Sequence, residues 1–233
     1  MYQDVEYGGI KGSSIKIYAR ERPAIPAARK RREEIVIPGR DGALYKSDGS
    51  YEPTEIEIPF NYIGREEDWS KRWREAQRWL GKENARLRLS DDDGYFFLIS
   101  YVDLSENERT SRRIGNFTAT FITRDGLYYL DSGLREYGKR EIRWNPYEAS
   151  HPVYRIYGEG MCTIEVNGKQ MKANVGQNLT IDTERMLAYR EDGTLRNTDV
   201  TGEYENLYLP EGEIRIEASY GFDIRITPNW RCR

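Results

Sequence analysis

The stretch Val36–Phe60, "VIPGRDGALYKSDGSYEPTEIEIPF", decides how the chain folds. Its two Asp-Gly pairs, at Asp41 and Asp48, favour tight turns because glycine adopts positive φ without strain. Apolar residues then occupy every second position from Ile56 to Phe60, which is typical of a strand with one buried face. Read alone, the Asp-Gly pairs also resemble calcium or phosphate loops. Their place between strand-like runs favours a structural role in turns over a ligand site.

The same alternation recurs on both sides of this stretch. "SSIKIYARE" carries apolar residues at Ile15 and Ile17, and "NFTATFITR" carries them from Phe117 to Phe121. Each run predicts a strand with one face against a core. The first half of the chain is therefore expected to be mainly β.

One helix interrupts these strands, in "REEDWSKRWREAQRWLGK". Acidic residues precede it and Gly81 follows it, which suits the two ends of a helix over about residues 66–80. Its tryptophans offer a stacking platform for a sugar or a nucleobase, but their helical spacing favours packing against a sheet. The residues predicted to face the core are Trp69, Trp73, Ala76 and Leu80.

After Asp125 the periodicity weakens, and the chain is interpreted as a connector with a short strand near residues 142–144. Strand-like runs then resume around an Asn-Gly turn at Asn167, and a final pair of strands is predicted about Gly221. Short strands with short turns predict a compact antiparallel sandwich. The chain is thus expected to have two domains, residues 1–140 and 141–233.

Composition suits a globular protein. The 233 residues are 38% hydrophobic and 12% aromatic, which leaves room for two modest cores. The first residues, "MYQDVEYGG", lack the apolar centre of a secretory signal. The longest apolar run, around "YFFLISYV", is too short to cross a bilayer. We expect a soluble protein that is synthesised in a cytoplasm.

Few residues are available for catalysis or metal binding. His151 is the one histidine and precedes a proline, which predicts a surface or linker position. Cys162 and Cys232 allow a disulfide but do not require one. The sequence contains neither a GxSxG elbow nor a nucleotide-binding glycine motif. "DDDG" at residues 91–94 suggests calcium binding or acid catalysis, but its place between two strand-like runs favours a hairpin turn. No cofactor, metal or catalytic residue is predicted.

Charge does not indicate a nucleic-acid binder. The net charge is −3, and neither half of the chain has a strong basic excess. Residues 20–40 are the local exception, with seven Arg or Lys against three Glu. A phosphate-binding arm is one interpretation of this cluster, and a solvated loop is the simpler one.

The order of these segments resembles a known family, the distal tail proteins of siphophages. In the first half the resemblance rests on Val36–Phe60, the Trp-rich helix ending in "WL", and "LRLSDDDGYFF". In the second half it rests on "NPYEASHPVYRIYGEG", "TIEVNGKQ", "LTIDTERMLAYREDG" and "LYLPEGEIRIEASYG". The resemblance covers nearly the whole chain.

The resemblance implies a mainly β protein with two β-sandwich domains. The first, a belt domain over residues 1–140, would carry the helix and an extended hairpin over about residues 31–60. The second, over residues 141–233, would be galectin-like. The family's members are structural virion proteins, without enzymatic activity or cofactor, that form a homohexameric hub at the distal end of a long non-contractile tail. Implied partners are the tail tube protein, a tail tip or tail-associated lysin-type protein, and a receptor-binding protein. DNA would pass through the lumen, and no membrane is involved.

A hairpin with free edges suits such a ring. Unpaired strand edges invite pairing with another chain, and heterologous contacts whose rotation closes give a ring. We therefore predict a subunit interface on the hairpin. Its candidate residues are Ile35, Ile37, Arg40, Asp41, Tyr45 and Tyr51.

Two other classes of protein stay open. A carbohydrate-binding module for host cell-wall polysaccharide would need an aromatic strip on one sandwich face, and a wall hydrolase would need two carboxylates in a cleft. The candidate stacking residues for the first are Trp144, Tyr154, Tyr157 and Trp230.

Overall fold

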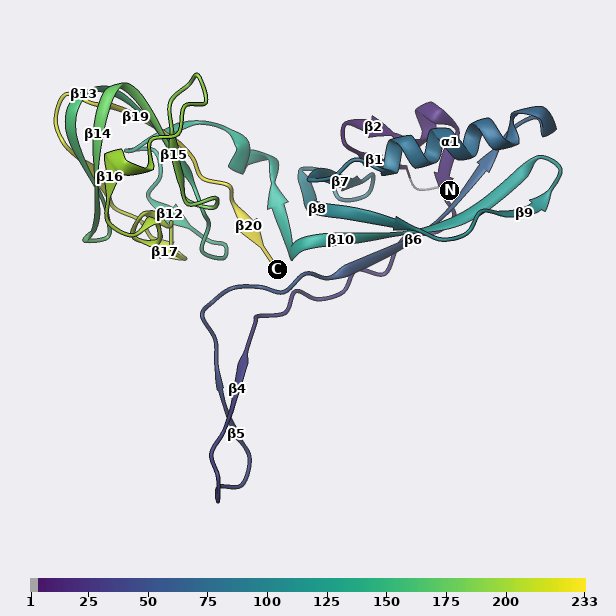
Figure 1. The fold of residues 1–233 in the computed structure, drawn as a ribbon, viewed down its shortest axis with the longest axis horizontal. Helices are drawn as coiled ribbons and strands as arrows, with labels where there is room; N and C mark the ends of the chain where they lie inside the picture. Colours follow the sequence, from purple (N-terminus) through teal and green to yellow (C-terminus); the bar gives the residue numbers. More distant parts are fainter. Residues whose placement is uncertain (1–3) are drawn as a thin grey trace. The chain divides into compact units, whose positions relative to one another are not determined.

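The structure, a computed structural model, describes residues 4–233 and contains two compact units (Figure 1). The first comprises residues 1–128 together with Arg233, and the second comprises residues 129–232. Strands dominate both, and α1 (Trp69–Leu80) is the one α-helix in the described part of the chain. The predicted mainly β class with a single helix is confirmed.

The first unit is built on one antiparallel sheet with the order β2-β1-β7-β8-β10-β6-β3, and β9 pairs with β10. The central pair is β6 with β10, in a register that places Phe60 opposite Phe117. The 3-10 helices η1 (Gly12–Ile15) and η2 (Glu66–Asp68) connect elements of this unit. Its strands are β1 (Val5–Tyr7), β2 (Ile10–Lys11), β3 (Ile17–Ala19), β6 (Glu55–Ile63), β7 (Ala85–Leu89), β8 (Tyr95–Leu104), β9 (Glu108–Ser111) and β10 (Ile114–Leu130).

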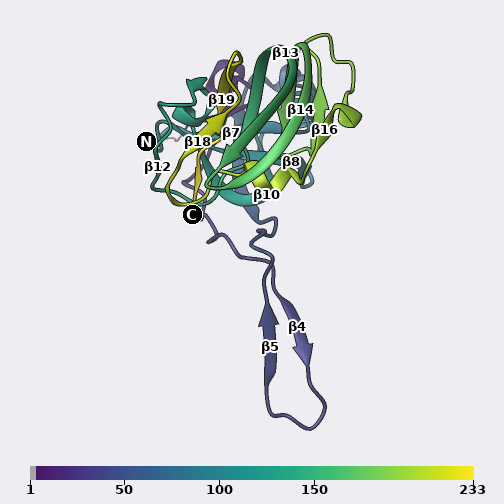
Figure 2. The same ribbon diagram turned by 90° about the vertical axis from the view of Figure 1, so that its left-hand side faces the viewer.

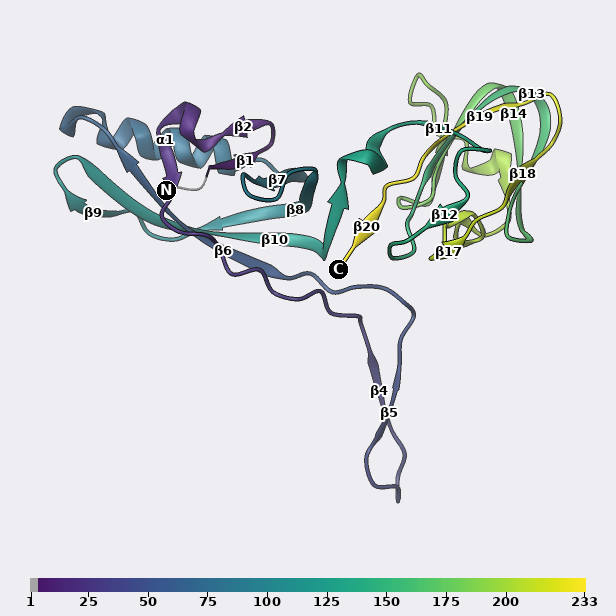
Figure 3. The same cartoon turned by 180° about the vertical axis from the view of Figure 1, so that it is seen from behind.

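The core of this unit lies between α1 and one face of the sheet (Figure 3). Alternate residues of β6 from Ile56 to Tyr62 are buried, as the period of two predicted. The Phe60 ring stacks on Phe117 with centroids 5.4 Å apart and meets Trp79 edge-on at 5.8 Å. These rings join the helix to the two central strands.

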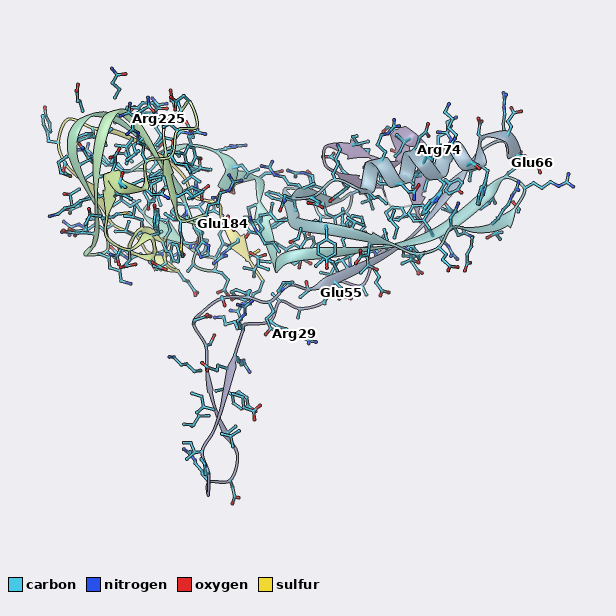
Figure 4. The ribbon with its side chains drawn as sticks, in the orientation of Figure 1. Arg29, Glu55, Glu66, Arg74, Glu184 and Arg225 are labelled. Carbon is cyan, nitrogen blue, oxygen red and sulfur yellow. The ribbon has the colours of Figure 1, made fainter. Side chains whose placement is uncertain are left out.

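The helix begins one turn later than predicted, because residues 66–68 form η2. Ala76 and Leu80 are buried as expected, whereas Trp69 and Trp73 are half-buried at the margin of the core. The most buried tryptophan is Trp79, whose indole N–H donates to the carbonyls of Tyr7 (3.0 Å) and Ile10 (3.2 Å). On the opposite side of α1, Arg74 faces outward (Figure 4).

A bend within β10 explains why the sequence suggested a connector after Asp125. β10 continues to Leu130, but at Gly126 the backbone has a φ of +69°, and the Gly126 N–H donates to the Thr123 hydroxyl at 3.0 Å. Beyond the bend Leu127 and Tyr129 are buried. The bend breaks the alternation of side chains, so the strand could not be recognised by its period. The two units divide within this strand, earlier than the predicted residue 140.

The second unit is built on the sheet order β11-β19-β13-β14-β15, with β16 on β14 and β18 on β13. β12 and β17 form a separate pair. The 3-10 helices are η3 (Asp131–Leu134), η4 (Asn197–Asp199) and η5 (Tyr204–Leu207). The strands are β11 (Tyr137–Gly138), β12 (Trp144–Asn145), β13 (Val153–Val166), β14 (Lys169–Asp182), β15 (Leu187–Tyr189), β16 (Val200–Thr201), β17 (Gly212–Glu213), β18 (Ile216–Ala218), β19 (Asp223–Thr227) and β20 (Arg231–Cys232).

The long hairpin of β13 and β14 organises this unit (Figure 2). Its turn has positive φ at Asn167 and Gly168, so the predicted Asn-Gly turn is confirmed. The predicted final pair of strands about Gly221 corresponds to β18 and β19, which both pair with β13 and not with each other. They act as one strand interrupted at residues 219–222. The interruption faces Gly158, where a Cβ would lie 2.5 Å from the Phe222 ring.

Replacement of Trp79 by phenylalanine tests the core. Trp79→Phe keeps an aromatic ring but leaves the carbonyls of Tyr7 and Ile10 without the indole donor. A buried acceptor that loses its partner costs about 1–3 kcal/mol, so the urea midpoint of the first unit should fall. The matched control is Trp144→Phe, at a residue that is 63% exposed. Equal midpoints for the two variants would contradict the role assigned to Trp79.

Alkaline titration tests the burial of Tyr7. Burial, with a smaller contribution from Glu83, raises the pKa of Tyr7 from 10.0 to about 12, and its hydroxyl donates to the Lys82 carbonyl. Because the folded state holds this proton more tightly, the stabilisation is complete below pH 10.0 and is lost as the pH rises towards about 12. Urea unfolding across this range should show the loss, and Tyr7→Phe should flatten it. A variant with the wild-type pH profile would refute this assignment.

Candidate functional site

The candidate site is the hairpin formed by β4 (Glu33–Val36) and β5 (Ala43–Lys46) (Figure 2). Its two strands form a sheet of their own, in which Ile35 lies opposite Leu44 and Glu34 lies opposite Tyr45. Residues 37–42 connect them. A turn follows Ile37, whose carbonyl accepts the Arg40 N–H at 3.2 Å, and Gly42 has a φ of +76°.

The hairpin exposes an unusual share of apolar side chains. Val36 is 69% exposed and Tyr45 is 64% exposed, and Ile35, Ile37 and Leu44 are each about two-fifths exposed. Side chains directly opposite each other share a face of a ribbon, so one face carries Ile35 with Leu44 and the other carries Val36 with Tyr45. Both faces therefore present apolar surface to solvent, and a two-stranded hairpin alone is at best marginally stable in water.

The base of the hairpin is better packed than its tip. Arg31 N–H donates to the Ser50 carbonyl at 2.8 Å, and Glu52 N–H donates to the Arg29 carbonyl at 2.9 Å. Between them Tyr51 is buried, with the Lys30 ammonium 5.6 Å from its ring centroid. Arg29 marks this base in Figure 4. The base holds the ribbon close to the start of β6.

The second Asp-Gly pair forms a local turn inside a bulge, with the predicted positive φ, +86°, at Gly49. Lys30 pairs with Tyr51 and Glu33 pairs with Lys46, so residues 31–32 face residues 47–50 across the ribbon. The Asp48 carboxylate accepts from the Ser50 N–H at 2.9 Å and from its hydroxyl at 2.6 Å. Both hydrogen bonds lower the pKa of Asp48. This short polar loop connects the hydrogen-bonded base of the hairpin to the paired strands β4 and β5.

The predicted interface residues fall into two groups. Ile35, Ile37 and Tyr45 lie in the exposed distal part, together with Arg40 and Asp41 of the loop. Tyr51 lies apart from them, buried at the base. The predicted hairpin, residues 31–60, is too long, because residues from Glu55 onward belong to β6 and the core. Val36 and Leu44 were missed, because a period of two from Ile35 and Tyr45 leads to Ile37 and Ala43 and passes over these two exposed apolar neighbours.

The predicted aromatic strip for carbohydrate stacking is wrong. Tyr154 is fully buried and its hydroxyl donates to the Leu207 carbonyl at 2.7 Å. Trp230 is also buried, and Tyr157 donates to the Glu191 carboxylate at 2.9 Å. Trp144 alone of the four is widely exposed. Tyr154 and Trp230 lie in the interior of the second unit and Tyr157 is half-buried, so the four side chains do not form one exposed flat platform.

The other candidate groups have structural roles. Residues 91–94 form the turn between β7 and β8, where Arg22 contacts Asp91 at 2.5 Å, and no group of three or more metal-ligating side chains occurs within residues 4–233. His151 lies in a segment between strands and is half-buried, with its ring stacked on Tyr208 at a centroid distance of 4.1 Å. Cys162 and Cys232 are both thiols. Among the described helices, none has the length and apolar character needed to cross a membrane.

Comparison with known proteins identifies the kind of protein that carries this hairpin. Residues 10–123 match the family described as "Phage tail protein RIFT-related domain". The chain is also similar to the crystal structure of Dit (gp 19.1) of phage SPP1, described as a paradigm of the hub adsorption apparatus in phages that infect Gram-positive bacteria. That match has a TM-score of 0.71 and 14% identity, and covers 96% of this chain and 97% of that one. No curated protein matches the chain.

Most of the first unit, residues 10–123, is therefore similar to a phage tail protein domain of the RIFT-related family. The chain as a whole has the fold of the distal tail protein Dit of SPP1. The resemblance to siphophage distal tail proteins, stated from the order of sequence segments, is confirmed. The galectin-like character of the second unit stays a prediction.

Hydrogen exchange tests the isolation of the hairpin. In the dissociated chain the amides of Ile35 and Leu44 should exchange far faster than those of Ile58 and Phe121, because exposed two-stranded ribbons open locally at little cost. The measurement is exchange followed by mass spectrometry on peptides from residues 33–46, 55–63 and 114–123. Comparable protection of the three peptides in the dissociated chain would show that the hairpin is packed.

Proposed function

We propose that this chain is the subunit of a tail hub: six copies form a ring at the distal end of a long non-contractile phage tail. The observation that carries the proposal is the apolar hairpin, set in a fold that matches Dit of SPP1 over nearly the full length of both chains. The role is structural and not catalytic.

The hairpin supports self-assembly for a physical reason. Each of its faces exposes an aliphatic or aromatic pair, and burial of such side chains contributes about 25 cal/mol per Å² of apolar surface removed from water. A neighbouring subunit that receives the ribbon would cover both faces and pair its free edges. The surface that receives the ribbon differs from the ribbon itself, so the contact is heterologous and its repetition closes a ring.

In this proposal the ring joins two parts of the tail. The tail tube protein contacts one side, and a tip protein or tail-associated lysin-type protein of the baseplate contacts the other. DNA passes through the central lumen during ejection. A receptor-binding protein is a further partner, and the belt domain, the first unit, carries the ring contacts.

Charge substitution on the hairpin tests ring formation. The variant Ile35→Glu, Ile37→Glu, Tyr45→Glu places carboxylates on exposed positions that the proposal buries between subunits. The wild type should give a hexamer by mass photometry and six-fold rings in negative stain. The variant should give a monomer with an unchanged circular dichroism spectrum.

The matched control carries Leu195→Glu and Tyr220→Glu, at residues of the second unit that are also widely exposed. The control should still assemble, since these positions lie outside the hairpin. A hexamer in the triple variant, or a wild type that stays monomeric at every concentration tested, would overturn the assignment of the interface.

A further inference from the structure

The first unit contains a groove of about 780 Å³ along the first half of β6. It lies on the face of the sheet that points away from α1, because the residues of β6 that line it alternate with the buried residues of the core. The segment after β3, residues 21–26, forms one wall, which is apolar at Ala24, Ile25 and Pro26. The opposite wall comes from β6, with Glu55, Glu57 and Pro59.

The groove is acidic, and its carboxylates lack cations. Glu21, Glu55 and Glu57 are exposed, and within residues 4–233 none of the three forms an ion pair. Arg22 also lines the groove, but it contacts Asp91 at 2.5 Å. Glu55, labelled in Figure 4, and Glu57 are two residues apart and therefore lie on the same face of β6. A cationic partner would remove the repulsion among these like charges.

The groove also follows an open edge of β6. On this edge β3 pairs with residues 60–62 only, and the Arg20 N–H donates to the Pro59 carbonyl at 2.8 Å. Alternate residues of a strand direct their backbone groups to the same edge, so the N–H and carbonyl groups of Glu55 and Glu57 also point to this side. In the described part of the chain, no backbone hydrogen bond joins residues 55–58 to residues 21–28. This edge can therefore pair with a strand of another chain.

The hairpin of β4 and β5 has the complementary properties. Residues 29–46 hold six Arg or Lys against three acidic residues. Of these cations, Arg32, Arg40 and Lys46 are exposed and form no ion pair with any residue that the structure describes. Both faces of the hairpin are apolar, and its two strands pair only with each other. The groove thus supplies anions, an apolar wall and a free strand edge, one for each property of the hairpin.

We infer that this groove, the β6 groove, receives the hairpin of the neighbouring subunit. The inference rests on the proposed ring and identifies the second surface of its contact. One edge of the hairpin pairs with the backbone groups of Glu55 and Glu57, its cations lie against the carboxylates, and its apolar side chains cover Ile25 and Pro26. Groove and hairpin are different surfaces of one chain, so the contact is heterologous and its repetition closes a ring.

Charge reversal on each surface tests this inference. The groove variant is Glu55→Arg, Glu57→Arg, and the hairpin variant is Arg32→Glu, Lys46→Glu. Each variant places like charges against each other at the contact, so each alone should be a monomer by mass photometry under conditions in which the wild type is a hexamer. The matched control is Glu106→Arg, Glu108→Arg, at exposed residues of the same unit outside the groove, and it should assemble as the wild type does.

An equimolar mixture of the two variants identifies the partners of the contact. The positive hairpin of the groove variant fits the negative groove of the hairpin variant, and the negative hairpin of the latter fits the positive groove of the former. The mixture should therefore form hexamers in which the two variants alternate, although neither assembles alone. A folding defect in either variant would not be repaired by mixing.

The outcomes separate this inference from the hub proposal. A groove variant that forms hexamers alone, while Ile35→Glu, Ile37→Glu, Tyr45→Glu is monomeric, would overturn the β6 groove and leave the hub in place. A mixture that stays monomeric, or a control that loses assembly as the groove variant does, would also overturn the groove. A wild type that is monomeric at every concentration would overturn both proposals.

Discussion

The packing of Phe60 against Phe117 and Trp79 is the contact on which the first unit depends. One ring joins the helix to the two central strands of the sheet, with centroids 5.4 and 5.8 Å from its neighbours. Aromatic pairs of this kind stabilise by about 0.5–1.5 kcal/mol each beyond the burial of area. β6, which carries Phe60, is also the strand that follows the hairpin in the chain. The core therefore holds the base of the hairpin as well as the sheet.

The first unit therefore contains exposed strands and a buried strand that follow one another directly in the chain. β6 buries alternate side chains completely, while β4 and β5 expose theirs. Segments that bind partners are drawn from the less stable parts of a fold, because their surfaces stay uncovered until the partner arrives. The short polar bulge at Asp48 and Ser50 lies between the exposed strands β4 and β5 and the buried strand β6.

The secondary structure could be predicted from the sequence where the apolar residues of a segment follow a single period, that of a strand or of a helix. The alternation from Ile56 to Phe60, the helical spacing about Ala76 and the Asn-Gly turn at Asn167 all correspond to elements of the structure. Prediction from the sequence failed where the backbone bends, as at Gly126, because a bend shifts the alternation. It also failed for Tyr154 of β13, since an aromatic residue on a strand points inward or outward according to a register that neighbouring strands decide. The exposed hairpin was recognised, because its Asp-Gly pairs and its apolar residues lie close together in the sequence.

The unequal arms of the hairpin have a geometric consequence. Because residues 47–50 are unpaired, gain or loss of one residue there leaves Ile35 opposite Leu44 and changes the bend between the base and the distal ribbon. The base and the core would be untouched by such a change. A single insertion or deletion can thus redirect all the exposed side chains of β4 and β5 together, a larger step than substitution of one side chain allows.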